Sequence, residues 1–423
     1  MFSVEKLNET FDKVMNRVPP GDIGLAVSGG SDSLALLFLA ADWAGRNSRR
    51  LEAVTIDHGL RSASKSECEY VSKVATELLI EHTTLTWLEK PAGNLQKLAR
   101  DARHRLFASW AKERNLSVVL LGHTLEDNAE TILMRLSRGS GVDGLTGMSQ
   151  SKNIKSLEIF RPLLKMSRLE LRNYLSARSV SWIDEPSNFD MRYQRVKIRK
   201  LLPTLATFGL TTNKLNAFGE HMARAKLALD LEVLRFAKKN VQQKSWGDLV
   251  IEQEAFRFLS SEYQVRLLSA ALRWTSGNEY RPRFNSLRRL LSQIKSETTM
   301  RGSSLMGCVI KCNGTKIVIT RELSAVPNSK IITQSRFLWD NKWILKVDDC
   351  KINRAAVGPL GKEGLSQLEK VNYMNIPTHA LQSSVALFEN GLVQCVPVLS
   401  YGSGLISEVD GGPESFFNFL TTY

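Results

Sequence analysis

The alternation of β-prone runs with helical patterns in the first 125 residues constrains the fold of this chain most. Runs rich in Val, Ile, Leu and Thr lie at residues 23–28, 51–57, 82–88 and 117–123. Helical patterns separate them, near residues 33–45, 64–81 and 94–115. Strands that alternate with helices of this length form a parallel sheet through right-handed crossovers. We therefore predict a doubly wound α/β domain at the N-terminus.

Polar residues gather where three of these runs end. The clusters are Ser28–Ser33, Asp57–Arg61 and His123–Glu130. Open α/β sheets bind their ligands at the carboxyl ends of the strands. We therefore expect the three clusters to converge on one site.

The first cluster reads Ser-Gly-Gly-Ser-Asp-Ser and lies between a strand and a helix. Glycines let the backbone approach an anion, and the hydroxyls and the helix N-terminus donate hydrogen bonds to it. The pattern GxxxxGK[ST] is absent, so this is not a Walker A loop. Without its lysine, we expect Mg²⁺ to neutralise a bound phosphate, with Asp32 as the local ligand. An ordinary helix start is the alternative interpretation.

The net charge of +14 is unevenly distributed. Residues 1–200 carry +6, residues 201–330 carry +10, and residues 331–423 carry −2. A basic chain favours a polyanionic partner, nucleic acid above all, although a well-solvated surface would also explain the charge. After residue 188 the pattern is helical and basic, and β-prone runs return near residue 305. We predict three domains: an α/β domain (1–205), a helical basic domain (206–325) and a small mixed α/β domain (326–423).

Cysteine usage and hydropathy exclude several classes of protein. Cys68, Cys308, Cys312, Cys350 and Cys395 form no CxxC pair, which argues against a disulfide framework or a zinc site. The first residues show no basic stretch followed by a long apolar one, so we expect no secretory signal, and no apolar run approaches the roughly 20 residues that span a bilayer. We expect a cytoplasmic protein without a membrane partner.

The motif SGGxDS after a first strand resembles the phosphate loop of the N-type ATP pyrophosphatases, the PP-loop enzymes. Those enzymes cleave ATP between its α- and β-phosphates, commonly adenylating an oxygen that a nucleophile then displaces. The resemblance implies a sheet of the adenine nucleotide alpha hydrolase type, with ATP as the cofactor.

Further segments resemble one family of these enzymes, the tRNA(Ile)-lysidine synthetases. In chain order they are TIDHGLR (55–61), GNLQKLARDARHRLF (93–107), LGHTLEDNAETILMRLSRGSG (121–141), GLTGM (144–148), RPLL (161–164), WIDEPSN (182–188) and RYQRVKIRKLLP (192–203). The likeness is dense over residues 23–203. The later residues share the layout of the family more than its motifs.

The resemblance implies an ATP-dependent ligase that acts on the wobble cytidine of tRNA(Ile) with a CAU anticodon. The 2-oxo group of the cytidine attacks the α-phosphate and releases pyrophosphate; the ε-amine of L-lysine then displaces AMP at that ring carbon and forms lysidine. A thiolating tRNA enzyme and a non-catalytic RNA-binding protein on the same fold are the alternatives. Thiolation generally needs paired cysteines, and Cys68 is the only cysteine before residue 308.

The phosphate loop and three residues beyond it are the expected ATP contacts: Ser28, Gly29, Gly30, Ser31, Asp32, Ser33, Asp57, His58 and Arg103. The expected catalytic residues are Asp32, Asp127, Glu130 and Arg195. Asp127 and Glu130 share one helix face, where carboxylates can orient and deprotonate an incoming ammonium group. An exposed acidic helix face is the alternative.

Two groups of arginines are the expected tRNA contacts. Helical spacing puts Arg192, Arg195 and Arg199 on one face, where they can hold the anticodon loop or neutralise phosphate charge. The basic middle region adds Arg281, Arg283, Arg288 and Arg289. The sequence leaves open whether the protein forms a homodimer.

Overall fold

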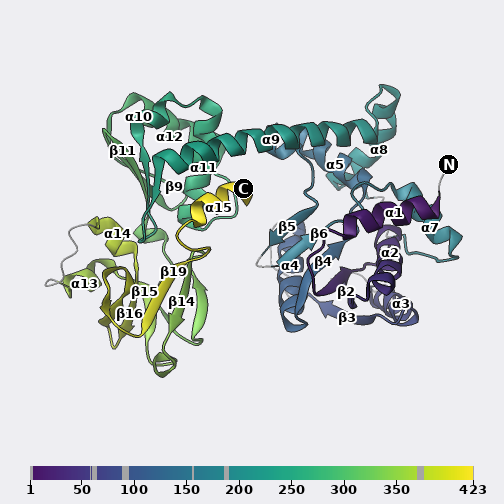
Figure 1. The fold of residues 1–423 in the computed structure, drawn as a ribbon, viewed down its shortest axis with the longest axis horizontal. Coiled ribbons are helices and arrows are strands. Elements are labelled where there is room, and N and C mark those ends of the chain that lie inside the picture. Colours follow the sequence, from purple (N-terminus) through teal and green to yellow (C-terminus); the bar gives the residue numbers. More distant parts are fainter. Residues whose placement is uncertain are drawn as a thin grey trace. The chain divides into compact units, whose positions relative to one another are not determined.

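The computed structural model describes residues 3–57, 59, 64–87, 95–154, 157–184, 190–368 and 376–422. Of the predicted site residues, His58 lies outside these ranges. The chain divides into two compact units, Met1–Lys226 and Leu227–Tyr423, whose elements are labelled in Figure 1.

The first unit alternates strands with helices. Its helices are α1 (Val4–Met15), α2 (Ser31–Asn47), α3 (Ser64–Glu77), α4 (Leu95–Glu113), α5 (Leu125–Leu136), α6 (Val142–Leu145), α7 (Arg168–Ala177), α8 (Gln194–Thr207) and α9 (Thr212–Asn240), which continues into the second unit. Its strands are β1 (Asp22–Ala26), β2 (Leu51–Asp57), β3 (Glu81–Thr86), β4 (Leu116–Leu121), β5 (Ser151–Ile154) and β6 (Leu157–Phe160).

The described strands of the first unit form one sheet in the order β3-β2-β1-β4-β6-β5. All neighbours are parallel except β5, which pairs antiparallel with β6 at the edge. The chain runs outward from β1 through β2 to β3 and then returns to the other side of β1 with β4. One apolar cluster holds residues of α2, α3 and α7, and a second holds residues of α4, so helices cover both faces. The predicted parallel α/β sheet is confirmed.

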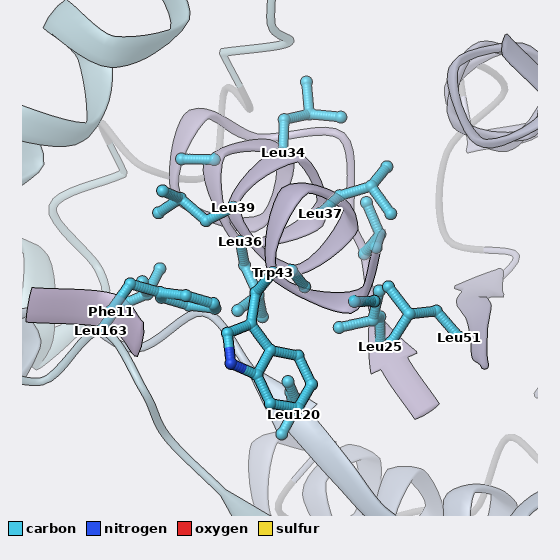
Figure 2. Packing of buried hydrophobic residues seen from close by; sticks show 14 of the residues in the cluster. Phe11, Leu25, Leu34, Leu36, Leu37, Leu39, Trp43, Leu51, Leu120 and Leu163 are labelled. Carbon is cyan, nitrogen blue, oxygen red and sulfur yellow. The ribbon is translucent and has the colours of Figure 1, made fainter. Parts of the chain in front are cut away.

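Helix α2 is buried on nearly all sides. Leu34, Leu36 and Leu37 are fully buried, and Figure 2 shows them among side chains from neighbouring elements, including Phe11 and Leu120. A helix that is apolar all round belongs to the core of a domain. This packing fixes the N-terminus of α2, where the polar loop ends.

The described residues of the second unit form helices and three antiparallel sheets. The helices are α10 (Gln253–Phe258), α11 (Ser261–Ser276), α12 (Phe284–Ser296), α13 (Gly361–Ser366), α14 (Thr378–Ser383) and α15 (Ser415–Thr422). The first sheet has the order β7-β8-β11-β10-β9, with β7 (Val241–Gln243), β8 (Leu249–Glu252), β9 (Thr299–Leu305), β10 (Cys308–Asn313) and β11 (Lys316–Arg321).

The other two sheets are built from residues 330–409. The second has the order β12-β15-β16-β17-β18, with β12 (Lys330–Ile331), β15 (Ala356–Pro359), β16 (Val385–Glu389), β17 (Leu392–Val396) and β18 (Tyr401–Gly402). The third joins β13 (Arg336–Trp339), β14 (Trp343–Val347) and β19 (Leu405–Val409). None of the helices in the described ranges is both long and apolar enough to cross a membrane.

Residues 206–325, all of which are described, hold the five strands β7–β11 as well as the predicted helices. Strands β7 and β8 are three and four residues long, too short for an alternating pattern to stand out within basic helical sequence. The core of this region also takes in Phe416 and Leu420 of α15, which pack in one cluster with Trp274. The proposed boundary at residue 325 stays a prediction.

A buried lysine links the sheets of the second unit. Lys342, just before β14, is 5% exposed; its ammonium donates to the carbonyl of Gly247 at 2.6 Å and lies 3.9 Å from the ring centre of Trp274. Burial lowers the pKa of Lys342, and the attraction of Asp248 opposes that shift. Asp248 is 2% exposed and accepts from the Thr320 hydroxyl at 2.9 Å. The two opposite charges therefore share one interior.

We expect Lys342→Met to destabilise the second unit by about 1–3 kcal/mol, because the Gly247 carbonyl loses its buried donor. Urea unfolding followed by tryptophan fluorescence measures the change. Lys346→Met, on the adjoining strand β14 and 46% exposed, is the matched control and should shift stability by less than about 0.5 kcal/mol. Equal effects of the two substitutions would contradict this account of Lys342.

Candidate active site

The polar loop between β1 and α2 is held by its own serines. The Ser33 hydroxyl accepts from the Ser28 N–H at 3.1 Å and donates to the Gly30 carbonyl at 3.0 Å. Among the described residues, no side chain caps the N–H groups that follow Gly30 at the start of α2. Unpaired N–H groups and the positive end of the helix dipole attract anions. The loop is thus shaped to accept a phosphate group.

Gly29 satisfies two constraints in this loop. Its φ of +85° lies in the left-handed region that favours glycine. A Cβ atom at this position would lie 3.0 Å from Cδ1 of Ile183, whose N–H donates to the Gly29 carbonyl at 2.9 Å. The segment around Ile183 therefore supports the loop from behind and leaves no room for a side chain.

A second glycine brings β4 against the start of α2. A Cβ atom on Gly122 would lie 3.1 Å from the Asp32 carbonyl oxygen and 3.2 Å from the Cα of Ser33. Both are backbone atoms at the beginning of a buried helix, so neither can move freely. The polar residues after β1 and after β4 are close because nothing larger than hydrogen separates the two backbones here.

One arginine joins three carboxylates from these two loops. Arg168, the first residue of α7, donates from Nε to Asp32 Oδ2 at 3.1 Å. Its Nη2 donates to Asp127 Oδ1 at 2.6 Å, and its Nη1 to Glu130 Oε1 at 3.2 Å. The backbone N–H of Arg168 donates to Glu126 Oε2 at 3.0 Å, which ties α7 to α5. The expected acidic residues therefore meet around a cation.

Glu130 is fully buried and is surrounded by arginines of α8 as well. Arg199 Nε donates to Glu130 Oε1 at 2.8 Å, and Arg195 Nε lies 3.2 Å from Oε2. Nη2 of Arg195 also donates to the Thr131 hydroxyl at 3.1 Å. A carboxylate is buried at tolerable cost only when it is paired in this way.

Asp127 has two partners on two sides. One oxygen, Oδ2, accepts from the N–H of Thr124 at 2.9 Å and closes a capping box at the start of α5, while Oδ1 faces Arg168. Burial raises the pKa of Asp127, but the attraction of Arg168 and Arg195 outweighs it and leaves that pKa below its usual value. Asp127 is therefore held ionised.

The charges of the cluster balance. Asp32, Asp127 and Glu130 supply three carboxylates, and Arg168, Arg195 and Arg199 supply three guanidinium groups. Burial raises the pKa of Asp32, with Arg168 opposing the rise, so this carboxylate depends on a nearby cation to stay ionised. Any anionic ligand must therefore bring a cation or rearrange these pairs.

Other predicted residues lie elsewhere. Arg192 does not share the face of Arg195 and Arg199, because α8 begins at Gln194 and Arg192 is paired with Asp190 at 2.7 Å. Arg103 is exposed on α4. Asp57, at the end of β2, accepts from the N–H of Gly59 at 2.8 Å and from the hydroxyl of Ser64, the first residue of α3.

Arg168 is the residue that the sequence analysis missed. A signal was present: the pattern Ser167-x-x-Glu170 is a capping box, and the structure contains it at the start of α7. That pattern places Arg168 in the first turn, where the helix dipole disfavours a cation. A cation at an unfavourable position indicates carboxylates or phosphates close by.

The parallel α/β sheet and the loop shaped to accept a phosphate indicate that the N-terminal unit is a nucleotide-binding domain of the PP-loop class. Comparisons with known proteins support this assignment. The family model described as PP-loop domain matches residues 3–205. The tRNA(Ile)-lysidine synthase of Ruegeria pomeroyi is 36% identical over 406 residues, which cover 96% of this chain and 95% of that protein. That of Wolbachia pipientis is 35% identical over 80% of each chain. This chain belongs to the tRNA(Ile)-lysidine synthase family.

We expect Gly122→Ala to weaken ATP binding at least about tenfold and to lower stability by about 1–3 kcal/mol, because the new methyl group must push β4 away from the start of α2. Calorimetric titration with ATP and a thermal melt measure the two effects. Gly45→Ala, on the solvent side of α2 with nothing within 4 Å of its Cβ position, is the control and should leave both unchanged or slightly improve stability. Normal ATP binding by Gly122→Ala would refute the close approach as a determinant of the site.

Proposed function

We propose that this protein is an ATP-dependent ligase that joins L-lysine to the wobble cytidine of tRNA(Ile) with a CAU anticodon. The observation that carries the proposal is the cluster of Asp32, Asp127 and Glu130 beside a PP-loop, in a chain that matches tRNA(Ile)-lysidine synthases over 96% of its length. In the first step the cytidine 2-oxo oxygen bonds to the α-phosphorus and pyrophosphate leaves. In the second, the lysine ε-nitrogen, having lost one proton, bonds to the ring carbon, AMP departs with that oxygen, and the nitrogen loses a second proton.

The loop of residues 28–33 is the proposed cradle for the phosphates of ATP. The N–H groups at the start of α2, which no side chain in the described part of the chain caps, favour an anion, and Asp32 lies in the same first turn. Within the described ranges, no three His, Cys, Asp or Glu side chains are grouped so as to hold a metal ion by themselves. Mg²⁺ commonly takes one or two carboxylates and completes its shell with phosphate oxygens and water. Asp32 fits that role, and Mg²⁺ would offset the phosphate charge that the paired arginines cannot.

Asp127 and Glu130 are the proposed binding groups for the lysine ammonium. Both carboxylates are buried, and Asp127 is held ionised. An ammonium group must lose a proton before it can attack carbon, and a carboxylate that orients it can also receive that proton. Arg195 and Arg199 lie beside Glu130, where they would stabilise charge that develops on the phosphate. Arg103 and Asp57 are proposed to border the nucleotide, together with His58.

The second unit is proposed to hold the tRNA by its phosphates. Helix α12 buries Leu287, Leu290 and Ile294 and exposes Arg288 and Arg289 on its other side. The preceding residues Arg281 and Arg283 are exposed as well. Exposed cations in a row favour contact with a phosphate backbone and carry little sequence information. Arg192, which is 87% exposed and precedes α8, is proposed to contact the anticodon arm.

The cysteines give no support to sulfur transfer. All five lie in the described residues, and four of them are buried, with Cys350 exposed in the second unit. Cys68, the single cysteine of the first unit, lies on α3, and burial raises the pKa of its thiol. A thiolating enzyme needs an accessible thiolate near the nucleotide.

The division of labour that we propose follows the predicted domains. Residues 1–205 carry out adenylation and lysine transfer, residues 206–325 grip the tRNA, and residues 326–423 support the fold. Such an enzyme would work in the cytoplasm, where tRNA and reduced cysteines are found. Gel filtration with light scattering distinguishes a monomer from the homodimer that the sequence leaves open.

We expect the wild-type protein, given ATP, Mg²⁺, radiolabelled lysine and total tRNA, to label one nucleoside that digestion identifies as lysidine. Asp32→Asn should abolish labelling and tRNA-dependent ATP–pyrophosphate exchange, because the loop loses its charged metal ligand. Asp42→Asn is the matched control on the same helix: Asp42 pairs with Arg178 and Tyr174 away from the loop, so exchange should be normal. Labelling of a different nucleoside would reject the proposed reaction.

We expect charge reversal of Arg281, Arg283, Arg288 and Arg289 to weaken cognate and non-cognate tRNA alike, and to flatten the dependence of log affinity on log salt. The slope reports the number of phosphates neutralised, about 0.9 for each contact on a duplex. Filter binding at several salt concentrations measures it. Reversal of four exposed cations in residues 331–423 (Arg336, Lys346, Arg354 and Lys362) is the control and should leave the slope unchanged. An unchanged slope in the first variant would remove α12 from the interface.

A further inference from the structure

Arg168 occupies the centre of the site and is given no part in the reaction proposed above. Its guanidinium is held by carboxylates from two elements, Asp32 at the start of α2 and Asp127 and Glu130 on α5. Its side chain is 18% exposed, so solvent provides little alternative pairing. The guanidinium donates one N–H to each of three acidic residues. It is therefore held more strongly than in a surface ion pair, but no single carboxylate binds it through two parallel hydrogen bonds.

The carboxylates that hold Arg168 are the same ones that would receive a lysine ammonium. A single ammonium group between Asp127 Oδ1 and Glu130 Oε1 would take the positions that Nη2 and Nη1 of Arg168 now fill. Glu130 Oε1 already accepts from Arg199 Nε as well as from Arg168 Nη1. An ammonium group cannot occupy the positions of the guanidinium nitrogens, and a further cation beside them would be repelled. The guanidinium must therefore leave at least one of the two carboxylates when lysine enters.

The partners that stay behind allow such an exchange. Without Arg168, Glu130 keeps its contacts with Arg199 and Arg195, and Asp127 keeps the capping contacts with Thr124. Neither buried carboxylate would be left bare, so releasing Arg168 does not carry the full cost of an unpaired buried charge.

A new partner for the guanidinium lies on the side of the phosphate loop. Arg172, one turn further along α7, already reaches that loop, with Nε 3.5 Å from the Ser31 hydroxyl. Helix α7 therefore carries one cation at the acidic cluster, Arg168, and another at the phosphate loop, Arg172. Phosphates bound there would attract Arg168 away from the carboxylates, and the charge balance of the site would then favour a cation in its place.

We propose that Arg168 occupies the subsite of the lysine ammonium in the substrate-free enzyme and vacates it when ATP binds, so that ATP prepares the site for lysine. This inference rests on the proposed function. Arg168 acts here as a positioning residue, because it controls access to Asp127 and Glu130. The consequence is a positive coupling between the two substrates, which thermodynamic linkage makes reciprocal.

Calorimetric titration of the full-length protein with lysine tests the coupling, with and without a non-hydrolysable ATP analogue and Mg²⁺. In the wild type, the analogue should tighten lysine binding at least about fivefold. In Arg168→Gln, lysine should bind without the analogue at least as tightly as it binds the wild type without it, and the analogue should change its affinity less than about twofold. Arg168→Lys keeps one charge but cannot reach three carboxylates at once, so it should give an intermediate coupling.

Arg178→Gln is the matched control, since it removes the same charge at the end of the same helix, where Arg178 pairs with Asp42. It should keep the coupling of the wild type. Thermal melts identify any variant that is not folded at the titration temperature, and Arg168→Lys then decides the question alone.

Equal coupling in the wild type and the Arg168 variants, no coupling in the wild type, or weaker lysine binding by Arg168→Gln in the absence of nucleotide would overturn the inference. Lysidine formation by the wild type, assayed separately, distinguishes the two failures. A wild type that makes lysidine but shows no coupling rejects the role of Arg168 alone. A wild type that incorporates no lysine into tRNA rejects the proposed function itself.

Discussion

The pairing of two parallel strands, β1 and β4, determines where the site of the first unit lies. The order of the sheet reverses between them, so the loops that follow them leave in opposite directions and open a space at the sheet edge. Gly122 allows the backbone after β4 to touch the first turn of α2. The burial of α2 on nearly all sides then prevents that turn from drifting away. A rigid apolar helix thus holds the polar end of the site.

Ion pairs, rather than apolar packing, hold the polar residues of the site in place. The site carries as many guanidinium groups as carboxylates, and all are close enough to be paired. Such a balance permits acidic residues to be buried and still ionised, since each has a cation within hydrogen-bonding distance. It also means that substrates with large opposite charges, such as a nucleotide and an amino acid with two ammonium groups, enter by exchanging partners rather than by filling a vacant pocket.

Local features made the sheet and the phosphate loop predictable. Alternating elements, a glycine pair after a strand and the spacing of Asp127 and Glu130 on one helix face each act within a few residues, so the sequence reveals them directly. The place of Arg168 in the site could not be predicted in this way, because its three partners lie 38 to 136 residues away in the chain. The expected alignment of Arg192 with Arg195 failed for a local reason: Asp190 offers a competing partner and the helix begins after Tyr193. The short strand β8 pairs with β11, some 65 residues later, and β7 joins that sheet only through β8, so no local pattern indicates the sheet.

The contribution of α15 to the core of the second unit has a consequence for synthesis on the ribosome. Phe416 packs edge-on against Trp274 with ring centres 5.7 Å apart, and the Ser415 hydroxyl accepts from the Trp274 indole N–H at 3.2 Å. While residues 227–400 emerge, this cluster lacks one wall, and a large aromatic side chain faces water. A nascent chain in that state offers an apolar surface to chaperones or to a neighbouring nascent chain. The core of the second unit is complete only after α15 has been translated. Its folding therefore depends on a segment made about 140 residues after the tryptophan that it covers.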